Sequence, residues 1–492
     1  MEPIRTDVLV VGGGLAGLTA AIGLGDLGLD VLVLEREPIL GGRARSWPDA
    51  ATGDPVHIGP HVFLTEYPNM LRLLDELGTR DRVVWQEDRF VTMVDGASQA
   101  VIRSDPRLPA PYHFVPSLLR VPGLKKRDVF SNWPVTQFAL TMREDDVRRL
   151  DLVNAEAFLR SMGVTATFLA WFWRFTSLSF MNLPLEITSA GALMRIYRAL
   201  IAKNDVRIGF PDGGLGDVFA PAARRAIERA GGRVCTSVVV RRLLHEGRRV
   251  TGAQLADGRI VRARHVVAAL PPGALREILP RPWVAEAPFD DLAHFHPVPY
   301  RCVYLWFDRK ITDLAFWART FRQHDLNTDF YDFSNIYRDW KDRPSMIGSN
   351  IIYSHRAEHL SDEEIAQRTL AELAEFLPAA KEARLVRWVV NHVPNVIHCP
   401  FPGTERRRPD QRSPIDGLFL AGDWTRTGFP CTMEGATRSG WLAAEAIRGD
   451  LGRPRALAVD YGPGEGLVPL FSRALRHVPT WHVGRWVRRL PA

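Results

Sequence analysis

The 492-residue sequence is poor in cysteine, with only four, and none of them forms a C-x-x-C pair. Scattered cysteines of this kind indicate neither a disulfide framework nor a metal site, and they fit a reducing compartment. No run of about 18 apolar residues occurs, so no membrane-spanning helix is expected. The first apolar stretch is interrupted by glycines and lacks a basic leader, so no secretory signal peptide is predicted. A cytoplasmic protein is the expectation.

Acidic residues are slightly outnumbered, 56 against 63 lysines and arginines, which gives a net charge of +7. No motif of a nucleic-acid-binding module accompanies this excess, so no nucleic-acid partner is expected. Residues 466–492 contain no acidic residue and mix arginines with tryptophans and leucines. This pattern is typical of an interfacial membrane segment, or equally of a tail helix packed on the body with a solvated arginine face. Residues 114–130 form a second apolar and basic candidate for membrane contact.

A glycine-rich fingerprint follows the first apolar run, Val8–Val11, which is typical of a buried parallel strand. Gly12, Gly14 and Gly17 have the G-x-G-x-x-G spacing that permits a tight turn, close approach to a pyrophosphate and close helix packing. The pyrophosphate would lie at the N-terminus of the helix that begins at Leu15 and Ala16. Glu35 ends the next apolar run, about 20 residues on, where a carboxylate accepts the ribose hydroxyls. A dinucleotide site is therefore predicted.

A second glycine pair, Gly41-Gly42, follows Glu35-Arg36 and precedes two arginines, Arg43 and Arg45. An extended FAD molecule needs this additional close backbone approach and positive charge. The chain here resembles the flavin-containing amine oxidase and phytoene desaturase superfamily, which shares this Gly-Gly-Arg segment. The resemblance implies FAD as cofactor.

The second fingerprint lies near the C-terminus, where residues 417–424 read Gly-Leu-Phe-Leu-Ala-Gly-Asp-Trp and run into residues 433–436. In the superfamily this aspartate, here Asp423, lies on the ribityl and pyrophosphate region. The helix that follows would direct backbone N–H groups at the edge of the flavin where negative charge gathers on reduction. Glu434 would cap that helix. The predicted FAD-binding residues are Gly12, Gly14, Leu15, Ala16, Gly17, Glu35, Arg36, Gly42, Arg43, Gly59, Pro60, His61, Val238, Gly422, Asp423, Met433 and Ala436.

Within the superfamily, residues 57–63 and 66–78 resemble the plant and cyanobacterial type of phytoene and zeta-carotene desaturases, and hydroxysqualene dehydroxylases are close relatives. The resemblance implies hydride transfer between flavin N5 and a long isoprenoid held in an apolar tunnel. His61 is the candidate catalytic residue, as proton acceptor or as positioning group, because its loop should approach the flavin. A quinone or oxygen is the expected electron acceptor.

Aromatic side chains crowd residues 168–175 on nearly every face of a predicted helix. A helix that is apolar all round is buried or faces lipid. This segment is therefore either plain core or the wall of the substrate tunnel. The candidate tunnel residues are Trp171, Phe172, Phe175, Phe180 and Phe429.

The fold class predicted is α/β, with a Rossmann-like FAD-binding domain of the GR2 type, discontinuous in sequence, and an inserted α+β substrate domain. The FAD-binding domain would comprise residues 1–95, 205–290 and 406–447, and the substrate domain 96–204 and 291–405, followed by a basic tail, 448–492. Within the FAD-binding domain, residues 220–230 are predicted as a helix and 234–240 as a strand beside the adenine. Residues 249–254 and 260–270 are predicted as a hairpin and return strand.

Three other functions stay open. A reductive hydroxysqualene dehydroxylase would run the electron flow in the opposite direction and yield squalene. A flavin amine oxidase is less expected, because the tyrosine of the usual aromatic cage is missing from residues 427–431. A prenyl-binding protein of the GDP-dissociation-inhibitor type shares the fold without flavin chemistry, but the intact nucleotide-binding residues disfavour it.

Overall fold

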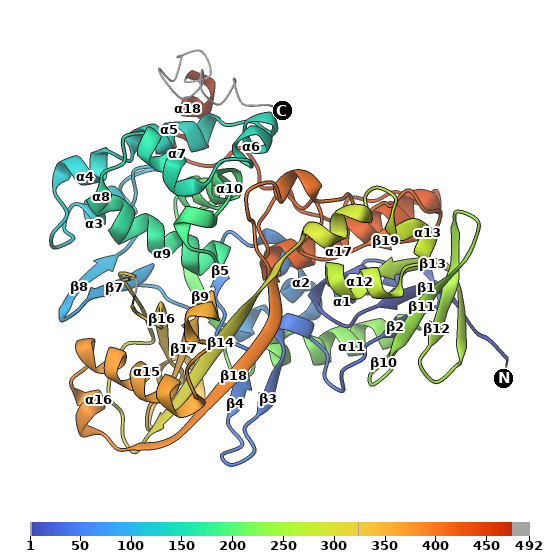
Figure 1. Cartoon of the computed structure of the whole chain (residues 1–492), viewed down its shortest axis with the longest axis horizontal. Helices are drawn as coiled ribbons and strands as arrows, with labels where there is room; N and C mark the ends of the chain where they lie inside the picture. Colours follow the sequence, from blue (N-terminus) through green and yellow to red (C-terminus); the bar gives the residue numbers. More distant parts are fainter. Residues whose placement is uncertain (1, 323, 475–492) are drawn as a thin grey trace.

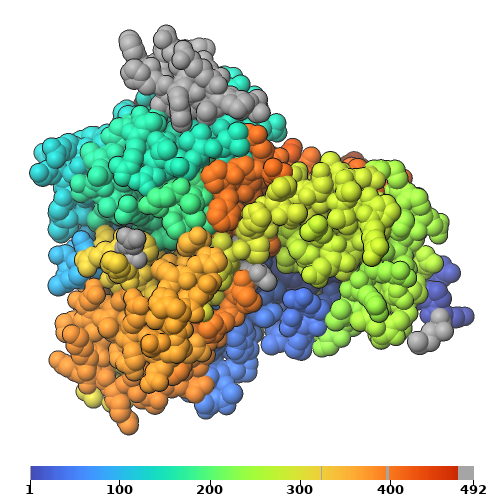
Figure 2. Space-filling view, in the orientation of Figure 1, coloured from blue at the N-terminus to red at the C-terminus, as the bar shows by residue number. Residues whose placement is uncertain are grey.

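Two seven-stranded sheets and a layer of short helices make up the molecule (Figure 1). The computed structural model describes residues 2–322 and 324–474. Figure 2 shows the helical layer, coloured teal, packed above the orange C-terminal half of the second sheet and its covering helices. The first sheet, which carries the dinucleotide fingerprints, lies to one side of both.

The first sheet has the strand order β10-β2-β1-β13-β12-β11, and β19 pairs with β13. The strands β10, β2, β1, β13 and β19 are parallel, whereas β11 and β12 form an antiparallel hairpin with β13. Buried apolar runs such as Val8–Val11 form the parallel core, as predicted. The strand bounds are β1 (Ile4–Val11), β2 (Val31–Leu34), β10 (Arg233–Cys235), β11 (Val240–Glu246), β12 (Arg249–Leu255), β13 (Ile260–Ala268) and β19 (Leu418–Leu420).

The single strand predicted over residues 234–240 is wrong. The chain leaves β10 at Cys235 and enters β11 only at Val240, and Ser237 between them has a φ of 58°. Cys235 pairs in parallel with Leu34, whereas Val240 pairs antiparallel with Leu255. Because the two strands have different neighbours, the chain must turn between them.

Helices cover both faces of this sheet. The helix predicted over residues 220–230 is confirmed as α11 (Ala220–Arg229), and it packs on the same side as α1 (Leu15–Ile22). The long C-terminal helix α17 (Met433–Asp450) packs closely on α1, because a Cβ added at Gly440 would lie 2.4 Å from the carbonyl oxygen of Ala16. The other helices near this sheet are α2 (Pro68–Leu77), α12 (Pro272–Ile278) and α13 (Arg281–Val284).

The second sheet has the order β18-β14-β17-β16-β15-β7-β8 and is antiparallel except between β15 and β7. One face packs on α15 (Asp362–Phe376), whose buried Ile365 and Leu373 share a core with Val303 and Ile347. The bounds are β7 (Val91–Asp95), β8 (Ser98–Ile102), β14 (Pro297–Phe307), β15 (Phe316–Arg319), β16 (Asp329–Asp332), β17 (Met346–Ile351), β18 (Leu385–His398), α14 (Phe333–Ile336) and α16 (Ala379–Glu382).

Two small sheets connect these parts. The strands β3 (Ser46–Pro48) and β4 (Pro55–His57) form a hairpin, and β9 (Ile208–Pro211) lies between β5 (Phe63–Leu64) and β6 (Val83–Trp85). The segment that joins β4 to β5, residues 58–62, therefore starts and ends in paired strands.

The helical layer includes the aromatic segment that the sequence predicts as one helix. The helix is present as one continuous run over residues 166–181, in which π-helical turns at Leu169–Trp173 and Ser177–Met181 alternate with the α-helical turns α8 (Ala166–Phe168) and α9 (Arg174–Thr176). The indole N–H of Trp173, which is fully buried, donates to Asn132 Oδ1 at 2.9 Å. The remaining helices are α3 (Val115–Leu118), α4 (Lys126–Phe130), α5 (Trp133–Thr141), α6 (Glu144–Leu150), α7 (Ala155–Ser161), α10 (Ala190–Ile201) and α18 (Val468–Ala474).

Over residues 2–322 and 324–474, none of the helices combines the length and apolar character needed to cross a bilayer. The basic tail proposed as a membrane segment continues past Ala474, and that part lies outside the described residues.

Candidate cofactor and active site

The first glycine loop is shaped so that only glycine fits at two of its positions. Gly12 has a φ of +111°, and a Cβ there would lie 2.3 Å from the carbonyl oxygen of Ala269. A Cβ at Gly17 would lie 2.0 Å from the carbonyl oxygen of Gly12. Helix α1 begins at Leu15 directly after this loop, and Gly14 at its N-cap has no side chain to occupy the free N–H groups. A phosphate oxygen suits that helix end.

Glu35 lies at the carboxyl end of β2, next to this loop. Its Oε2 accepts from the N–H of Gly13 at 2.7 Å, and the N–H of Val238 donates to its backbone oxygen at 2.9 Å. The structure thus brings Glu35 and Val238 together at the carboxyl edge of the parallel strands, where dinucleotides bind. The side chain of Arg36, in contrast, is 69% exposed and pairs with Glu37.

The second glycine pair packs against the first loop. The N–H of Gly41 donates to the Gly13 oxygen at 2.9 Å, and a Cβ at Gly42 would lie 3.2 Å from Gly14 Cα. Two backbone segments without side chains therefore meet here, which leaves room for an extended cofactor.

Arg43 connects the two fingerprints. Its Nη2 lies 2.6 Å from Oδ1 of Asp423, a buried residue after β19. Gly422, with a φ of +150°, donates its N–H to Ser439 Oγ of α17 at 2.8 Å. The side chain of Asp423 is thereby held by Arg43, and the residue before it is held by Ser439 of α17.

Helix α17 begins at Met433 after the N-cap Thr432, whose Oγ1 accepts from the N–H of Gly435 at 3.2 Å. The N–H of Ala436 donates to the backbone oxygen of Thr432 at 3.0 Å. The first-turn N–H groups that remain give this helix end a partial positive charge, which suits the electron-rich edge of a reduced flavin.

The expectation that Glu434 caps its own helix is wrong. Its carboxylate accepts from the N–H groups of Asn69 at 3.2 Å and Met70 at 2.9 Å, so it caps α2 instead. The Asn69 side-chain amide adds a third hydrogen bond at 2.7 Å. Burial raises the pKa of Glu434 to about 6. Because Glu434 faces away from its own N-terminus, the end of α17 is left free for a ligand.

The loop of Gly59, Pro60 and His61 is held by the second sheet. A Cβ at Gly59 would lie 2.2 Å from the Tyr300 hydroxyl, and Tyr304 donates its hydroxyl proton to the His57 oxygen at 3.0 Å. The face of the second sheet that does not contact α15 therefore holds the loop of residues 59–61 in place.

His61 Nδ1 lies 2.7 Å from the backbone oxygen of Gly59. Since a carbonyl oxygen only accepts, Nδ1 carries the proton, and the lone pair of Nε2 is available. Burial lowers the pKa of His61, and the nearby positive charge of Arg43 lowers it further. The imidazole is therefore neutral at pH 7 and able to accept a proton.

Sequence reasoning missed a buried polar group beside this loop. Asn350 Nδ2 donates to the Pro60 oxygen at 3.4 Å, and Asn350 Oδ1 accepts from the Tyr300 hydroxyl. Asp329 faces the same side of the sheet and accepts from the Tyr331 hydroxyl at 3.4 Å through Oδ2. Burial raises the pKa of Asp329 to about 7. No sequence motif identifies Tyr300, Asp329 and Asn350, because they come from three separate strands.

Aromatic rings gather at Phe429, in the loop that precedes α17. Its ring centroid lies 5.9 Å from that of Tyr67 and 5.1 Å from that of Tyr461. The other candidate tunnel residues, Trp171, Phe172, Phe175 and Phe180, are partly buried against the core of the helical layer. No ring contact joins them to Phe429 within the described part of the chain.

Comparisons with known proteins agree with this geometry. Residues 15–448 match the family of flavin containing amine oxidoreductases. The chain is 29% identical over 464 residues to the 15-cis-phytoene desaturase of Synechococcus elongatus, covering 89% of this chain and 95% of the relative. It is also 29% identical to the chloroplastic/chromoplastic 15-cis-phytoene desaturase of Solanum lycopersicum, covering 90% of this chain and 77% of the relative.

Solved structures show the same fold. Putrescine oxidase bound to putrescine superposes with a TM-score of 0.68 at 18% identity, covering 91% of this chain and all of the other. Cyclohexylamine oxidase from Brevibacterium oxydans gives a TM-score of 0.64 at 20% identity, with the same coverage. With its two glycine loops, its buried Glu35 and its Arg43–Asp423 pair, this chain belongs to the flavin containing amine oxidoreductase family and is an FAD-dependent oxidoreductase.

Proposed function

We propose that this oxidoreductase desaturates a long apolar isoprenoid of the carotenoid type. The observation that carries the proposal is the similarity to 15-cis-phytoene desaturases, which extends over 89% of this chain, beyond the cofactor segments. A probable zeta-carotene desaturase of Synechococcus elongatus is also similar, at 26% identity over 479 residues. The substrate-domain strands fall within these matches.

Desaturation of a C–C bond next to a double bond removes a hydride from one carbon and a proton from its neighbour. Bound FAD would accept the hydride. The cation left behind is strongly acidic at the neighbouring carbon, so a weak base is sufficient. His61 is the candidate proton acceptor, because its Nε2 lone pair is free once Nδ1 donates to Gly59.

The buried aromatic side chains around Tyr67 and Phe429, whose ring centroids lie 5.9 Å apart, suit an apolar substrate. Tyr67, Phe429 and Tyr331 are each at most 4% exposed, and they present rings rather than charges. Burying each methylene of a polyene contributes about 0.8 kcal/mol, so such walls bind a long hydrocarbon without specific polar contacts. Trp171, Phe172, Phe175 and Phe180 stay candidates for a more distant part of the tunnel.

The deciding experiment is anaerobic. The visible absorbance of oxidised flavin is followed while liposome-dispersed phytoene, hydroxysqualene or putrescine is added in separate samples. Bleaching by phytoene, with a new conjugated product, is the expected result. Bleaching by putrescine alone would replace the proposal with amine oxidation. Reoxidation of pre-reduced flavin by hydroxysqualene, with squalene appearing, would replace it with reductive dehydroxylation.

A peripheral position on the cytoplasmic membrane face belongs to the same proposal, since the substrate would reside in lipid. Phe130 is 58% exposed and Leu119 38% exposed, beside the lysine and arginine residues 125–127. Exposed apolar side chains flanked by basic ones suit an anionic bilayer. A membrane quinone would then be the natural electron acceptor, with oxygen as the alternative.

Vesicle sedimentation tests the membrane contact. Phe130→Ser should weaken binding to anionic vesicles severalfold. Val386→Ser, on β18, is the matched control because Val386 is also 58% exposed. Equal binding by both variants and the unchanged protein would refute contact through this surface.

A further inference from the structure

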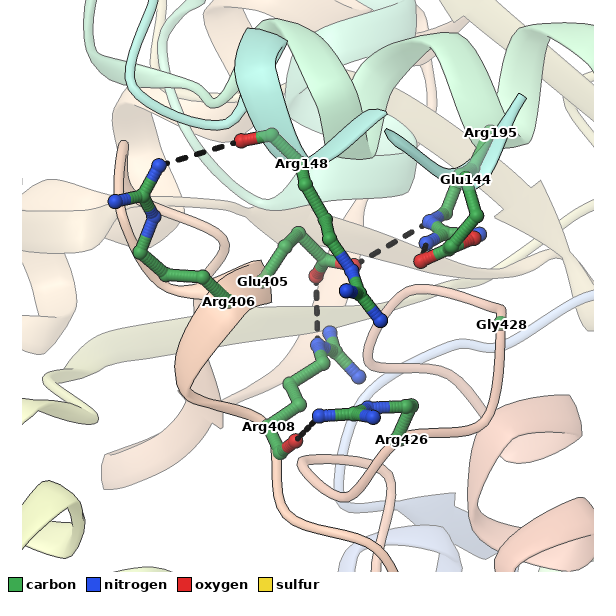
Figure 3. Close-up of a pocket in the computed structure, with 8 residues that line it drawn as sticks. All are labelled: Glu144, Arg148, Arg195, Glu405, Arg406, Arg408, Arg426 and Gly428. Carbon is green, nitrogen blue, oxygen red and sulfur yellow. Dashed lines mark hydrogen bonds and ion pairs between the residues drawn. The ribbon is translucent and has the colours of Figure 1, made fainter. Parts of the chain in front are cut away.

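A pocket of about 330 Å³ lies between the helical layer and the chain that leads into the loop before α17, residues 422–432 (Figure 3). Helices α6 and α10 form one side, and the segments at 405–408 and 426–428 form the other. The lining residues are Glu144, Arg148, Arg195, Glu405, Arg406, Arg408, Arg426 and Gly428. Five arginines against two glutamates leave the lining with a net charge of +3.

The two glutamates are already engaged. Glu405 lies 2.6 Å from Arg408 Nε and 3.5 Å from Arg195 Nε, and it is buried between them. Glu144 pairs with Nη2 of Arg195. The acidic side chains of the lining thus neutralise Arg195 and Arg408. The other three arginines have no acidic partner within the lining, although Arg406 lies 4.0 Å from Asp151 outside it.

Arg148 and Arg426 carry most of this excess charge. The Arg148 guanidinium has no ion pair within residues 2–322 and 324–474. The backbone oxygen of Arg148 accepts a hydrogen bond from Nη2 of Arg406 at 3.4 Å. Arg426 lies 3.5 Å from Asp410, whose side chain is 64% exposed and so screens it weakly. In Figure 3 the Arg148 guanidinium points toward those of Arg408 and Arg426. Like charges that converge in a concave site favour an anion between them.

We propose that this pocket binds a phosphate-bearing anion, with Arg148 and Arg426 as its principal ligands. The planar guanidinium presents paired donors that match phosphate oxygens, and the net charge of the lining suits a diphosphate better than a single carboxylate. The volume is sufficient for a diphosphate. The anion comes either from solution or from a lipid headgroup, and the chemistry of recognition is the same for both.

The pocket is connected to the loop before α17, residues 422–432, through Arg408. Its Nη1 donates to the backbone oxygens of Asp423 at 2.6 Å, Thr425 at 3.2 Å and Phe429 at 3.3 Å. An anion beside Arg408 would hold this guanidinium and the loop in place. Anion binding should therefore reduce the mobility of the segment that carries Asp423 and Phe429.

Titration calorimetry of the FAD-loaded protein with inorganic pyrophosphate, and separately with inorganic phosphate, tests the proposal. Saturable binding is expected, with pyrophosphate the tighter ligand. The double variant R148Q/R426Q should bind at least tenfold more weakly. Both side chains are exposed, so we expect the variant to fold, and its flavin content and Tm check this. Arg453→Gln, an exposed arginine outside the pocket, is the matched control and should bind as the unchanged protein does.

An experiment with lipid vesicles distinguishes a dissolved anion from a lipid headgroup. If the dissolved anions do not bind, vesicles containing phosphatidic acid should retain the protein through Arg148 and Arg426, whereas phosphatidylcholine vesicles should not. Loss of that retention in R148Q/R426Q, but not in Arg453→Gln, would assign a lipid headgroup. The proposal is overturned if neither dissolved anion nor phosphatidic acid binds, or if the double variant binds as well as the control. None of these readouts depends on desaturase activity.

Discussion

Arg43 and Asp423 lie 380 positions apart in the sequence, and their side chains form a 2.6 Å ion pair. The pair joins the segment after the first glycine loop to the strand end before α17. It therefore connects the two halves of the cofactor site, and it supplies one charge of each sign beside the place expected for the diphosphate and ribityl chain.

Replacing Arg43 should impair FAD retention. Arg43→Met removes a hydrogen bond to a charged group, worth about 1.5–3 kcal/mol, and so should weaken FAD affinity roughly tenfold to a hundredfold. Titration of the apoprotein with FAD measures this. The control is Arg36→Gln: although the sequence predicts Arg36 as a cofactor residue, its side chain is 69% exposed, and its replacement should change affinity little. Equal loss in both variants would contradict the assignment.

Gly17→Ala should abolish tight FAD binding and lower stability. Its Cβ would lie 2.0 Å from the Gly12 carbonyl oxygen, which is backbone and cannot move aside. Overpacking of this kind costs about 1–3 kcal/mol. Thermal unfolding and flavin content are the measurements. Gly273→Ala in α12 meets no atom within 4 Å and should leave both unchanged or raise the Tm slightly. Normal FAD content in Gly17→Ala would refute the close approach of α1 to the loop.

His61→Gln should slow flavin reduction by phytoene by about 10²–10⁴-fold while FAD is retained. The glutamine amide can still donate to the Gly59 oxygen, but it cannot accept a proton. Because the pKa of His61 lies below its ordinary value of 6.5, the rate in the unchanged protein should be flat above that pH and fall in acid. Stopped-flow rates against pH check this. If His61→Gln keeps both the rate of flavin reduction and its decrease at acidic pH, His61 is not the proton acceptor.

Asp329 should make stability depend on pH. Its pKa in the folded state is about 7, above the ordinary value, so the protonated form is favoured on folding. The contribution is present at low pH and is lost as the pH rises through 7. Between pH 5 and pH 8 the free energy of unfolding should fall by up to roughly 3 kcal/mol through this group.

Asp329→Asn should remove that dependence, so the variant gains stability relative to the unchanged protein as the pH rises. Chemical denaturation at pH 5, 6.5 and 8 measures the difference. Asp313→Asn serves as the control, because Asp313 lies on the surface between β14 and β15 and should shift nothing. A constant difference between Asp329→Asn and the unchanged protein at all three pH values would contradict the assignment.

The geometry of the first glycine loop and the position of Glu35 were predictable from sequence because their determinants are local, whereas the FAD contacts of these residues stay predictions. Gly12, Gly17 and Glu35 act through turns and strand ends that a few neighbouring residues define, and the structure places Glu35 beside the loop as expected. The role of Arg36 in cofactor binding stays a prediction. Its side chain is 69% exposed and pairs with Glu37.

Local pattern also misassigned Glu434, since a glutamate in a first helical turn is most simply explained as a cap for that helix. The packing of α2 against α17 offered it two other N–H groups instead. Residues 427–431 contain no tyrosine, but the rings of Tyr67 and Tyr461, from segments outside the C-terminal motif, lie beside Phe429.

The sequence by itself determined the nucleotide-binding fold and its cofactor, because glycine spacing and apolar strands act over a few residues. Only the tertiary structure decided the surroundings of the reaction and of the anion pocket. Asp329, Asn350 and Tyr300 come from three strands, and Arg148 and Arg426 from segments nearly 280 positions apart. The burial of a side chain and the approach of like charges depend on which distant segments pack together. A local sequence pattern does not contain that information.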